Sequence, residues 1–358
     1  MTPEFRTSDF DYNLPPELIA QEPLPDRGGS RLLAVLRTSE PSDLPGPRTA
    51  VGSAVLVDSN FAELPRVIHP GDLLVLNTTR VRHARLLATR PSGASAEVLL
   101  IRPQANGEWL ALGKPGHALR PGKRVSLGPG EEIQTVAVLE DGHRLIRFIG
   151  ITSDAAIARY GRLPLPPYIR RDPTELDERR YQTVYAQREG SVAAPTAGLH
   201  FTPALLDQLA GAGVEIAGLE LEVGPGTFKP VETEDPRQHA MHVESYEIPE
   251  RLACSVERVR AEGHQVWAVG TTVVRALESA ACRQGLLRPG AGETRLMITP
   301  GYQFRVVDHM LTNFHLPRST LLMLVSAFAG HQLTMAAYRH AIEQRYRFYS
   351  YGDAMLIL

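Results

Sequence analysis

The chain has 358 residues, which is long enough for two domains that each bury a core of their own. Its hydrophobic share of 43% and charged share of 22% are those of an ordinary globular protein, and a net charge of −2 excludes the overall basic character of many nucleic-acid-binding proteins. Two isolated cysteines, Cys254 and Cys282, exclude a disulfide framework and a thiolate metal site.

The N-terminal third begins with alternating turns and apolar runs. No apolar segment of the secretory type opens the chain, so we expect a cytoplasmic protein. Residues 31–36 predict a strand, 61–64 a short helix, and 71–77 an apolar strand that is buried on both faces. These elements indicate the first part of an α/β domain.

Arginines cluster after this strand and recur as two later pairs. They are Arg80, Arg82, Arg85 and Arg90, then Arg170 with Arg171 and Arg179 with Arg180. A phosphate-binding patch on an otherwise neutral protein is one interpretation, and a solvated charged surface is the other.

The pattern of apolar residues and turns changes over residues 82–152. Short apolar runs at 97–101, 109–112, 124–127, 133–139 and 144–148 alternate with Gly and Pro turns, and no helical pattern appears. This spacing predicts a small antiparallel β-barrel inserted into an α/β domain that is formed by residues 1–81 and 153–358. The proline-rich segment 164–168 stiffens the return connection.

The segment 194–202 places His200 on a turn of small residues just before a helix. Thr202 is a good N-cap and Pro203 suits the first helical position, so the helix should run over about 204–210. A helix N-terminus disfavours the protonated imidazole, which would leave His200 neutral and able to accept a proton. A capping or packing histidine is the alternative.

A glycine-rich turn at 224–231, containing Gly226 and Lys229, ends a strand predicted at 214–223. Open α/β sheets bind ligands at the carboxyl ends of their strands, although a plain tight turn would give the same sequence. The turn matches neither a dinucleotide fingerprint nor a P-loop.

Residues 239–244 bring together two histidines and a carboxylate. Their spacing fits no zinc signature, so no metal is expected. In a strand His242 and Glu244 would share a face, where the carboxylate could tune the imidazole as a base.

Helices are predicted at 249–262 and 273–283, on either side of a strand at 265–269. The strand-to-helix turn after this strand offers backbone N–H groups and the hydroxyls of Thr271 and Thr272 as an anion site, with simple capping as the alternative. We expect Thr271, Thr272 and Arg275 to face the same cleft as Thr196, Gly198 and His200.

The C-terminal part carries a second polar segment. Asn313 and His315 alternate with apolar residues and therefore share one face of an extended stretch, as a buried pair or a functional one. Residues 319–338 lack any charged residue and predict one buried core helix rather than a membrane span. A polar turn with Asp353 precedes an apolar final strand.

These segments occur together and in order, from 10–12 and 18–21 to 351–355, and in this the chain resembles the S-adenosylmethionine:tRNA ribosyltransferase-isomerases of queuosine synthesis. The resemblance runs essentially end to end. One departure is Thr78, where the family usually has Asp.

The resemblance implies that S-adenosylmethionine is consumed as a ribosyl donor and is not a cofactor. Its ribose would be transferred to 7-aminomethyl-7-deazaguanine at the tRNA wobble position and isomerised to give epoxyqueuosine, with release of adenine and methionine. A base must remove the proton beside the sulfonium, and the attacking amine must be neutral. A monomer without a membrane partner is expected.

Residue roles follow from the resemblance as expectations. The acid–base candidates, among which no role is assigned, are His200, His242, Glu244, Asp308 and His315. The expected substrate-binding residues are Thr196, Gly198, Gly226, Lys229, Thr271, Thr272, Arg275, Asn313 and Asp353. The expected tRNA-binding residues are Arg80, Arg82, Arg85, Arg170 and Arg171.

Two other functions fit parts of the sequence. An S-adenosylmethionine-dependent RNA methyltransferase would use the same donor, but the glycine fingerprint of a Rossmann fold is missing. A non-catalytic RNA-binding protein could be built around the barrel, but the polar segments lie mainly outside it.

Overall fold

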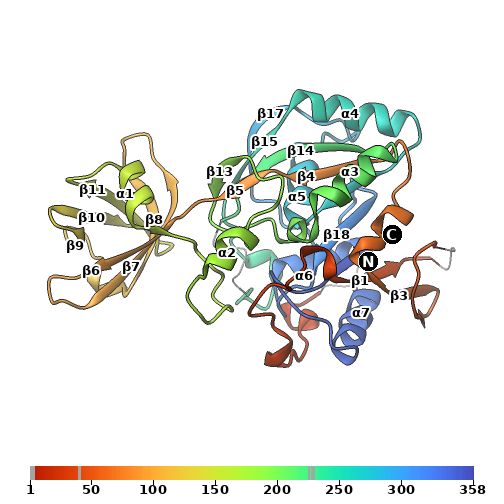
Figure 1. Ribbon diagram of the computed structural model, residues 1–358, viewed down its shortest axis with the longest axis horizontal. Helices are drawn as coiled ribbons and strands as arrows, with labels where there is room; N and C mark the ends of the chain where they lie inside the picture. Colours follow the sequence, from red (N-terminus) through yellow and green to blue (C-terminus); the bar gives the residue numbers. More distant parts are fainter. Residues whose placement is uncertain (1–4, 39–41, 225, 227–229) are drawn as a thin grey trace.

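A ten-stranded mixed sheet forms the centre of the computed structural model, which describes residues 5–38, 42–224, 226 and 230–358 (Figure 1). The strand order is β17-β15-β14-β4-β16-β18-β19-β1-β3-β2. The four strands β14, β4, β16 and β18 run parallel to one another, and β19 lies antiparallel to β18 and parallel to β1. The strands are β1 (Arg31–Leu36), β2 (Arg48–Val51), β3 (Ala54–Asn60), β4 (Leu73–Asn77), β14 (Glu215–Leu221), β15 (Glu244–Ile248), β16 (Val266–Val269), β17 (Gly290–Thr294), β18 (His309–Asn313) and β19 (Ala354–Ile357).

Helices cover both faces of this sheet, because successive strand residues alternate between two cores. In β4, Leu73 and Val75 join the core under α4, α5, α6 and α7, whereas Leu74 and Leu76 join the core under α3. The helices are α1 (Ser153–Tyr160), α2 (Glu175–Arg180), α3 (Pro203–Gly211), α4 (Glu250–Ala261), α5 (Thr271–Ala280), α6 (Thr320–Ala329) and α7 (His331–Glu343).

Most predicted elements of the α/β part are confirmed. The helix after His200 is α3, and the Thr202 side chain accepts the Leu205 N–H at its start. The short helix predicted at 61–64 is a 3₁₀ helix over Phe61–Arg66.

The prediction of one core helix over 319–338 is wrong. Gly330 has a φ of 91°, a conformation that favours glycine, and it divides the stretch into α6 and α7, which meet at an angle of 114°. Among the described residues no single helix could span a membrane; only this bent pair has the length and composition when its two helices are taken together.

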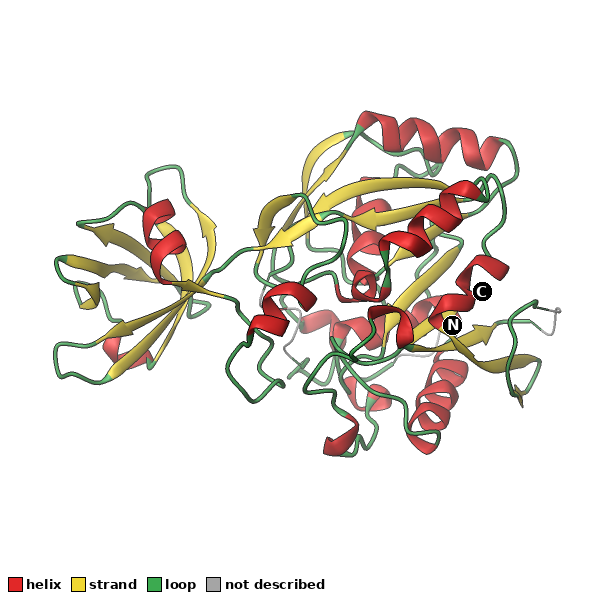
Figure 2. Cartoon of the chain, viewed as in Figure 1, coloured by secondary structure: helices red, strands yellow, loops and turns green. Residues whose placement is uncertain are grey.

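A second sheet has seven strands in the order β12-β6-β7-β8-β11-β10-β9, and every pairing in it is antiparallel (Figure 2). Its first long strand, β6, also pairs with β9 through Thr89 and Ser126. The strands are β6 (Arg85–Thr89), β7 (Ser95–Pro103), β8 (Trp109–Lys114), β9 (Arg124–Gly128), β10 (Glu131–Val138), β11 (Arg144–Ile149) and β12 (Gly161–Arg162).

This small unit stands apart from the large sheet (Figure 1). It has a core of its own, to which Leu86, Val98, Ile133 and Ile146 contribute. The elements α1 and β12 also pack on it, beyond residue 152. The chain enters the unit from β5 (Thr79–Val81), which pairs with β13 (Arg188–Ser191).

Candidate active site

A cleft opens where the parallel strands β14, β16 and β18 end. Its walls come from the turn before α3, the start of α5, the residues after β18, and the turn before β19. The lining residues are Tyr168, Ala194, Pro195, Thr196, Ala197, Val223, Gly270, Thr271, Thr272, Thr312, Asn313, Phe314, His315, Leu316, Ser319, Leu321, Tyr349 and Ser350. This is the sheet edge at which open α/β folds bind ligands.

The starts of two helical segments meet in this cleft. Gly270, with a φ of 95°, turns the chain from β16 into α5, and a Cβ added there would lie 3.6 Å from the Cβ of Ala197. Thr196, Thr271 and Thr272 therefore line one cleft. The Thr272 hydroxyl is buried and has no hydrogen-bond partner among the described residues.

Asn313 lines the cleft, and neighbouring residues hold only one of its two side-chain amide atoms. Its Nδ2 donates to the Tyr349 carbonyl at 3.1 Å and to the His200 Nε2 at 3.1 Å. Its Oδ1 has no hydrogen-bond partner among the described residues, although the side chain is only 2% exposed. A buried, unsatisfied carbonyl oxygen is costly, so we expect a donor from outside the described residues to reach this atom.

His200 lies behind Asn313, away from the cleft lining. Because the Asn313 Nδ2 donates to Nε2, Nδ1 carries the proton and donates to the Ser30 Oγ at 2.9 Å. Burial, followed by the charges of Arg27, Arg347 and Arg180, lowers the pKa of His200 to about 3. The ring is neutral, as the sequence suggested, but burial and not a helix terminus is the main cause.

His315 is the imidazole that lines the cleft. Its Nε2 lies 2.7 Å from the Thr312 hydroxyl, and its backbone N–H donates to the Tyr338 hydroxyl. Burial lowers the pKa of His315 to about 3, so this ring is also neutral.

Tyr349, Ser350 and Tyr168 complete the cleft, and sequence reasoning missed them as site residues. Tyr349 adopts a left-handed backbone with a φ of 70°, which is uncommon for a bulky residue, and so turns its carbonyl toward Asn313. The hydroxyl of Tyr168 lies 2.5 Å from that of Ser350. The polar run before the final strand was the sequence signal for Tyr349 and Ser350, and the proline-rich segment 164–168 was the signal for Tyr168.

Five residues expected to bind substrate either do not line the cleft or fall outside the described residues, and three of them are Gly198, Gly226 and Lys229. Gly198 does not line the cleft; a Cβ there would lie 2.0 Å from the Tyr185 hydroxyl, so close packing explains the glycine. Gly226 lies against the His242 ring, and Lys229 falls outside the described residues. His242 itself packs edge-on to His143 of the small unit, with ring centroids 5.5 Å apart.

Glu244 and Arg275 form a buried ion pair, with side chains 4% and 6% exposed. Arg275 also donates from Nε to the Leu296 carbonyl at 3.0 Å. The pair joins β15 to α5, and Arg275 is not among the residues that line the cleft.

Asp308 and Asp353 have structural roles. Asp308 accepts the Val266 N–H at the amino end of β18, roughly 16 Å along the strand from Asn313. Asp353 accepts the N–H groups of Arg31 at 3.0 Å and Arg347 at 2.8 Å and so fastens β1 to the turn before β19. Burial raises the pKa of both carboxyl groups.

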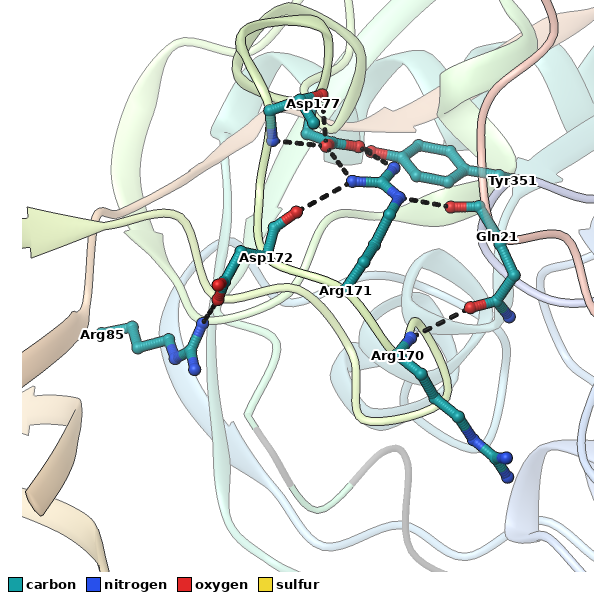
Figure 3. Close-up of polar contacts among 8 residues, drawn as sticks. Gln21, Arg85, Arg170, Arg171, Asp172, Asp177 and Tyr351 are labelled. Atoms are coloured by element: carbon teal, nitrogen blue, oxygen red, sulfur yellow. Dashed lines mark hydrogen bonds and ion pairs between the residues drawn. The ribbon is translucent and has the colours of Figure 1, made fainter. Parts of the chain in front are cut away.

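The predicted tRNA-binding arginines divide into two groups. Arg171 donates to the buried Asp177, and Arg85 contacts Glu97 and Asp172, so both are occupied within the chain. In Figure 3 the Arg170 side chain extends away from these pairs.

The remaining arginines are more accessible. Arg80 is exposed, and Arg82 lies 5.1 Å above the Trp109 ring of the small unit.

Among the described residues no cluster of three or more His, Cys, Asp or Glu side chains could hold a metal ion.

Comparison with known proteins identifies a consistent set of relatives. The model of the family described as "Queuosine biosynthesis protein" matches residues 7–357. The S-adenosylmethionine:tRNA ribosyltransferase-isomerase of Symbiobacterium thermophilum is 51% identical, over 99% of this chain and 100% of the relative. That of Thermus thermophilus is 52% identical, over 98% of each chain.

A solved structure is similar over the whole length. The crystal structure of S-adenosylmethionine tRNA ribosyltransferase from Thermotoga maritima is 36% identical, with a TM-score of 0.55, over 98% of this chain and 100% of the other.

Proposed function

The chain belongs to the family of queuosine biosynthesis proteins, and from this premise we propose how its cleft carries out the reaction. The chain is a transferase-isomerase that moves and rearranges the ribosyl group of S-adenosylmethionine, with tRNA as the other substrate. We propose that the acceptor is 7-aminomethyl-7-deazaguanine at the wobble position. Epoxyqueuosine, adenine and methionine are then the products.

One observation carries the assignment of the site: two buried polar groups in the cleft lack partners among the described residues. The Asn313 Oδ1 can only accept a hydrogen bond, and the Thr272 hydroxyl can donate one. Adenine presents a matching pair, an exocyclic amino donor and ring-nitrogen acceptors. We assign the adenine of S-adenosylmethionine to these two residues, at the ends of the neighbouring strands β18 and β16.

His315 is the proposed proton acceptor. It lines the cleft, and its low pKa keeps the ring free of a proton at neutral pH. Removal of the proton beside the sulfonium would create a buried imidazolium, which is unfavourable without a counter-charge. A group of the bound substrates has to offset that cost, so His315 becomes an effective base only when the donor is bound.

His200 is the proposed positioning residue. Its Nε2 lone pair is already used by Asn313, so it is not free to take a proton from a substrate. Its contribution is to hold the amide of Asn313 in the orientation that exposes Oδ1.

The small antiparallel sheet is the proposed inserted barrel; it was predicted over residues 82–152 and continues through α1 and β12 to Arg162. The pairing of β6 with both β7 and β9 supports a closed sheet. Arg80, Arg82 and Arg170 are the proposed phosphate contacts, because the anticodon loop must reach a cleft next to this junction. We further propose a cytoplasmic monomer without a resident cofactor.

Product analysis tests the function. The purified protein is incubated for a single turnover with S-adenosylmethionine and tRNA that carries the aminomethyl-deazaguanine base. We expect adenine and methionine in equal amounts and a tRNA that gains the mass of the rearranged ribose. Formation of S-adenosylhomocysteine and a methylated tRNA would instead identify a methyltransferase, and the absence of both product sets would contradict the proposal.

A further inference from the structure

Arginines gather on the far side of Asn313 from the cleft. Arg27 and Arg180 line a narrow pocket together with His200, Ser350 and Gly352. A third arginine, Arg347, lies close enough for its charge to act on His200 together with those of the other two.

Backbone carbonyls hold these guanidinium groups in place. Arg27 donates to the carbonyls of Gln182, Leu199 and Arg179 at 3.0–3.1 Å. Arg180 donates to those of Leu24 and Pro25, and Arg347 donates to that of Glu22. Within the described part of the chain, none of the three forms an ion pair with a carboxylate. The groups are therefore fixed without being neutralised.

Some N–H groups of these arginines have no hydrogen-bond acceptor among the described residues. Arg180 Nε and Arg347 Nη1 are buried and have no hydrogen-bond partner among the described residues. Burial and the neighbouring charge of Arg180 lower the pKa of Arg27.

The carboxylates nearby do not balance this charge. The charge of Asp26 favours the protonated form of Arg180, but Asp26 is exposed to solvent. The two oxygens of Asp353 already accept hydrogen bonds from the backbone N–H groups of Arg31 and Arg347. An uncompensated group of half-buried cations is unfavourable unless an anion joins it.

We propose that this arginine pocket binds an anionic group of a substrate, either the carboxylate of S-adenosylmethionine or a phosphate of tRNA. The planar, fixed donors of arginine suit both anions. The pocket adjoins the cleft, because Ser350 lines both and the bond between His200 and Asn313 links their walls. The identity of the two anions rests on the proposed function.

The test begins with the unmodified protein and needs no variant. S-adenosylhomocysteine carries the carboxylate, and methylthioadenosine lacks it. If the pocket binds the donor carboxylate, sulfate should compete with S-adenosylhomocysteine and leave methylthioadenosine binding unchanged, as measured by calorimetry.

Variants then separate the two sources of the anion. Arg180→Gln removes the charge, Arg180→Lys keeps it, and Arg339→Gln, exposed on α7, is the matched control. Loss of a charge-assisted hydrogen bond should weaken binding of the anion by about 10- to 100-fold. If the pocket binds the donor carboxylate, Arg180→Gln should lose affinity for S-adenosylhomocysteine and keep its affinity for tRNA. If the pocket binds a phosphate, Arg180→Gln should lose affinity for tRNA, and its tRNA affinity should depend less on salt concentration.

The proposal is overturned if sulfate does not compete with either ligand and the affinities of Arg180→Gln for S-adenosylhomocysteine and tRNA stay within twofold of the parent. Melting temperature shows whether each variant folds; if Arg180→Gln does not, Arg180→Lys and the sulfate competition decide the question. Product analysis with the parent reports on the proposed function separately, so the two conclusions can fail independently.

Discussion

Asn313 shows how a buried side chain can be held still by neighbours that never meet the substrate. Two acceptors, the Tyr349 carbonyl and the His200 ring, fix its Nδ2, and Oδ1 has no hydrogen-bond partner among the described residues. The arrangement depends on a neutral His200, because a protonated ring would turn an N–H toward the amide N–H. Burial supplies that neutrality.

The first prediction tests this dependence with a double-mutant cycle. Asn313→Ala should slow single turnover by about 10- to 100-fold, the effect of one lost hydrogen bond to a bound ligand. His200→Gln should also slow it. The double variant should be no more than about threefold slower than Asn313→Ala, because His200 acts through the amide.

Additive losses would contradict a positioning role for His200. They would return it to the chemical step as a base, provided that melting temperatures show all three variants to be folded.

The second prediction concerns stability against pH. His200 and His315 have folded pKa values of about 3, below the ordinary 6.5, so the unfolded chain binds more protons between these values. The free energy of unfolding should therefore fall as the pH drops from 6.5 toward 3, with each histidine adding a slope of up to about 1.4 kcal/mol per pH unit.

Chemical denaturation at a series of pH values measures this slope. His315→Gln should flatten it by the share of one histidine, and an unchanged slope would show that His315 is not buried in its neutral form.

At the scale of elements, the segment that returns from the small unit is fastened through Asp177. This fully buried carboxylate receives the Arg171 guanidinium, the Thr174 N–H and hydroxyl, and the Tyr351 hydroxyl (Figure 3). Burial opposes its ionisation, but these donors outweigh burial and hold the pKa of Asp177 well below its usual range. The start of α2 is thereby joined to the turn before β19.

The third prediction follows from this network. Asp177→Asn should destabilise the fold by about 3–5 kcal/mol, because it leaves the Arg171 charge uncompensated. Asp172→Asn is the control: its side chain is 79% exposed, and its contact with Arg85 should be worth less than about 1 kcal/mol. Equal losses for the two variants in urea unfolding would contradict the central role of Asp177.

Elements with local signals were predictable, and those that depend on distant partners were not. Thr202 and Pro203 correctly predicted the start of α3. The apolar run of β4 correctly predicted a strand that is buried between two cores. The break at Gly330 was missed, because the stretch has no charged residue or proline and a single glycine is tolerated inside a helix. In the structure α7 packs against α6 and β1 after the bend.

At the scale of the whole molecule, the order of the strands in the large sheet determines which distant residues lie next to one another. The strand order brings segments around residues 196, 271, 313 and 349 to one edge, and no local pattern encodes that order. Sequence could therefore place Thr271 and Asn313 in polar segments. It could not show that Arg275 pairs with Glu244, or that Asp308 lies at the other end of its strand.

The fourth prediction concerns tRNA. Replacing Arg80, Arg82 and Arg170 together by Gln should weaken tRNA binding and reduce the slope of log affinity against log salt by about two to three, roughly one per phosphate contact. Arg85→Gln should leave the slope unchanged, since Glu97 and Asp172 already neutralise it. A reduced slope for Arg85→Gln alone would contradict this division.

Two covalent crossings join the small unit to the α/β body, one after β5 and one after β12. A body tethered at one point can swivel in every direction, whereas a body tethered at two points keeps a single axis of rotation, the line through both tethers. Rotation of the small unit about that axis would break two contacts between the units, the His143–His242 ring contact and the Arg102–Glu293 ion pair. The two units are therefore held together by two chain connections and by these two side-chain contacts, and any change in their relative orientation has to break the contacts.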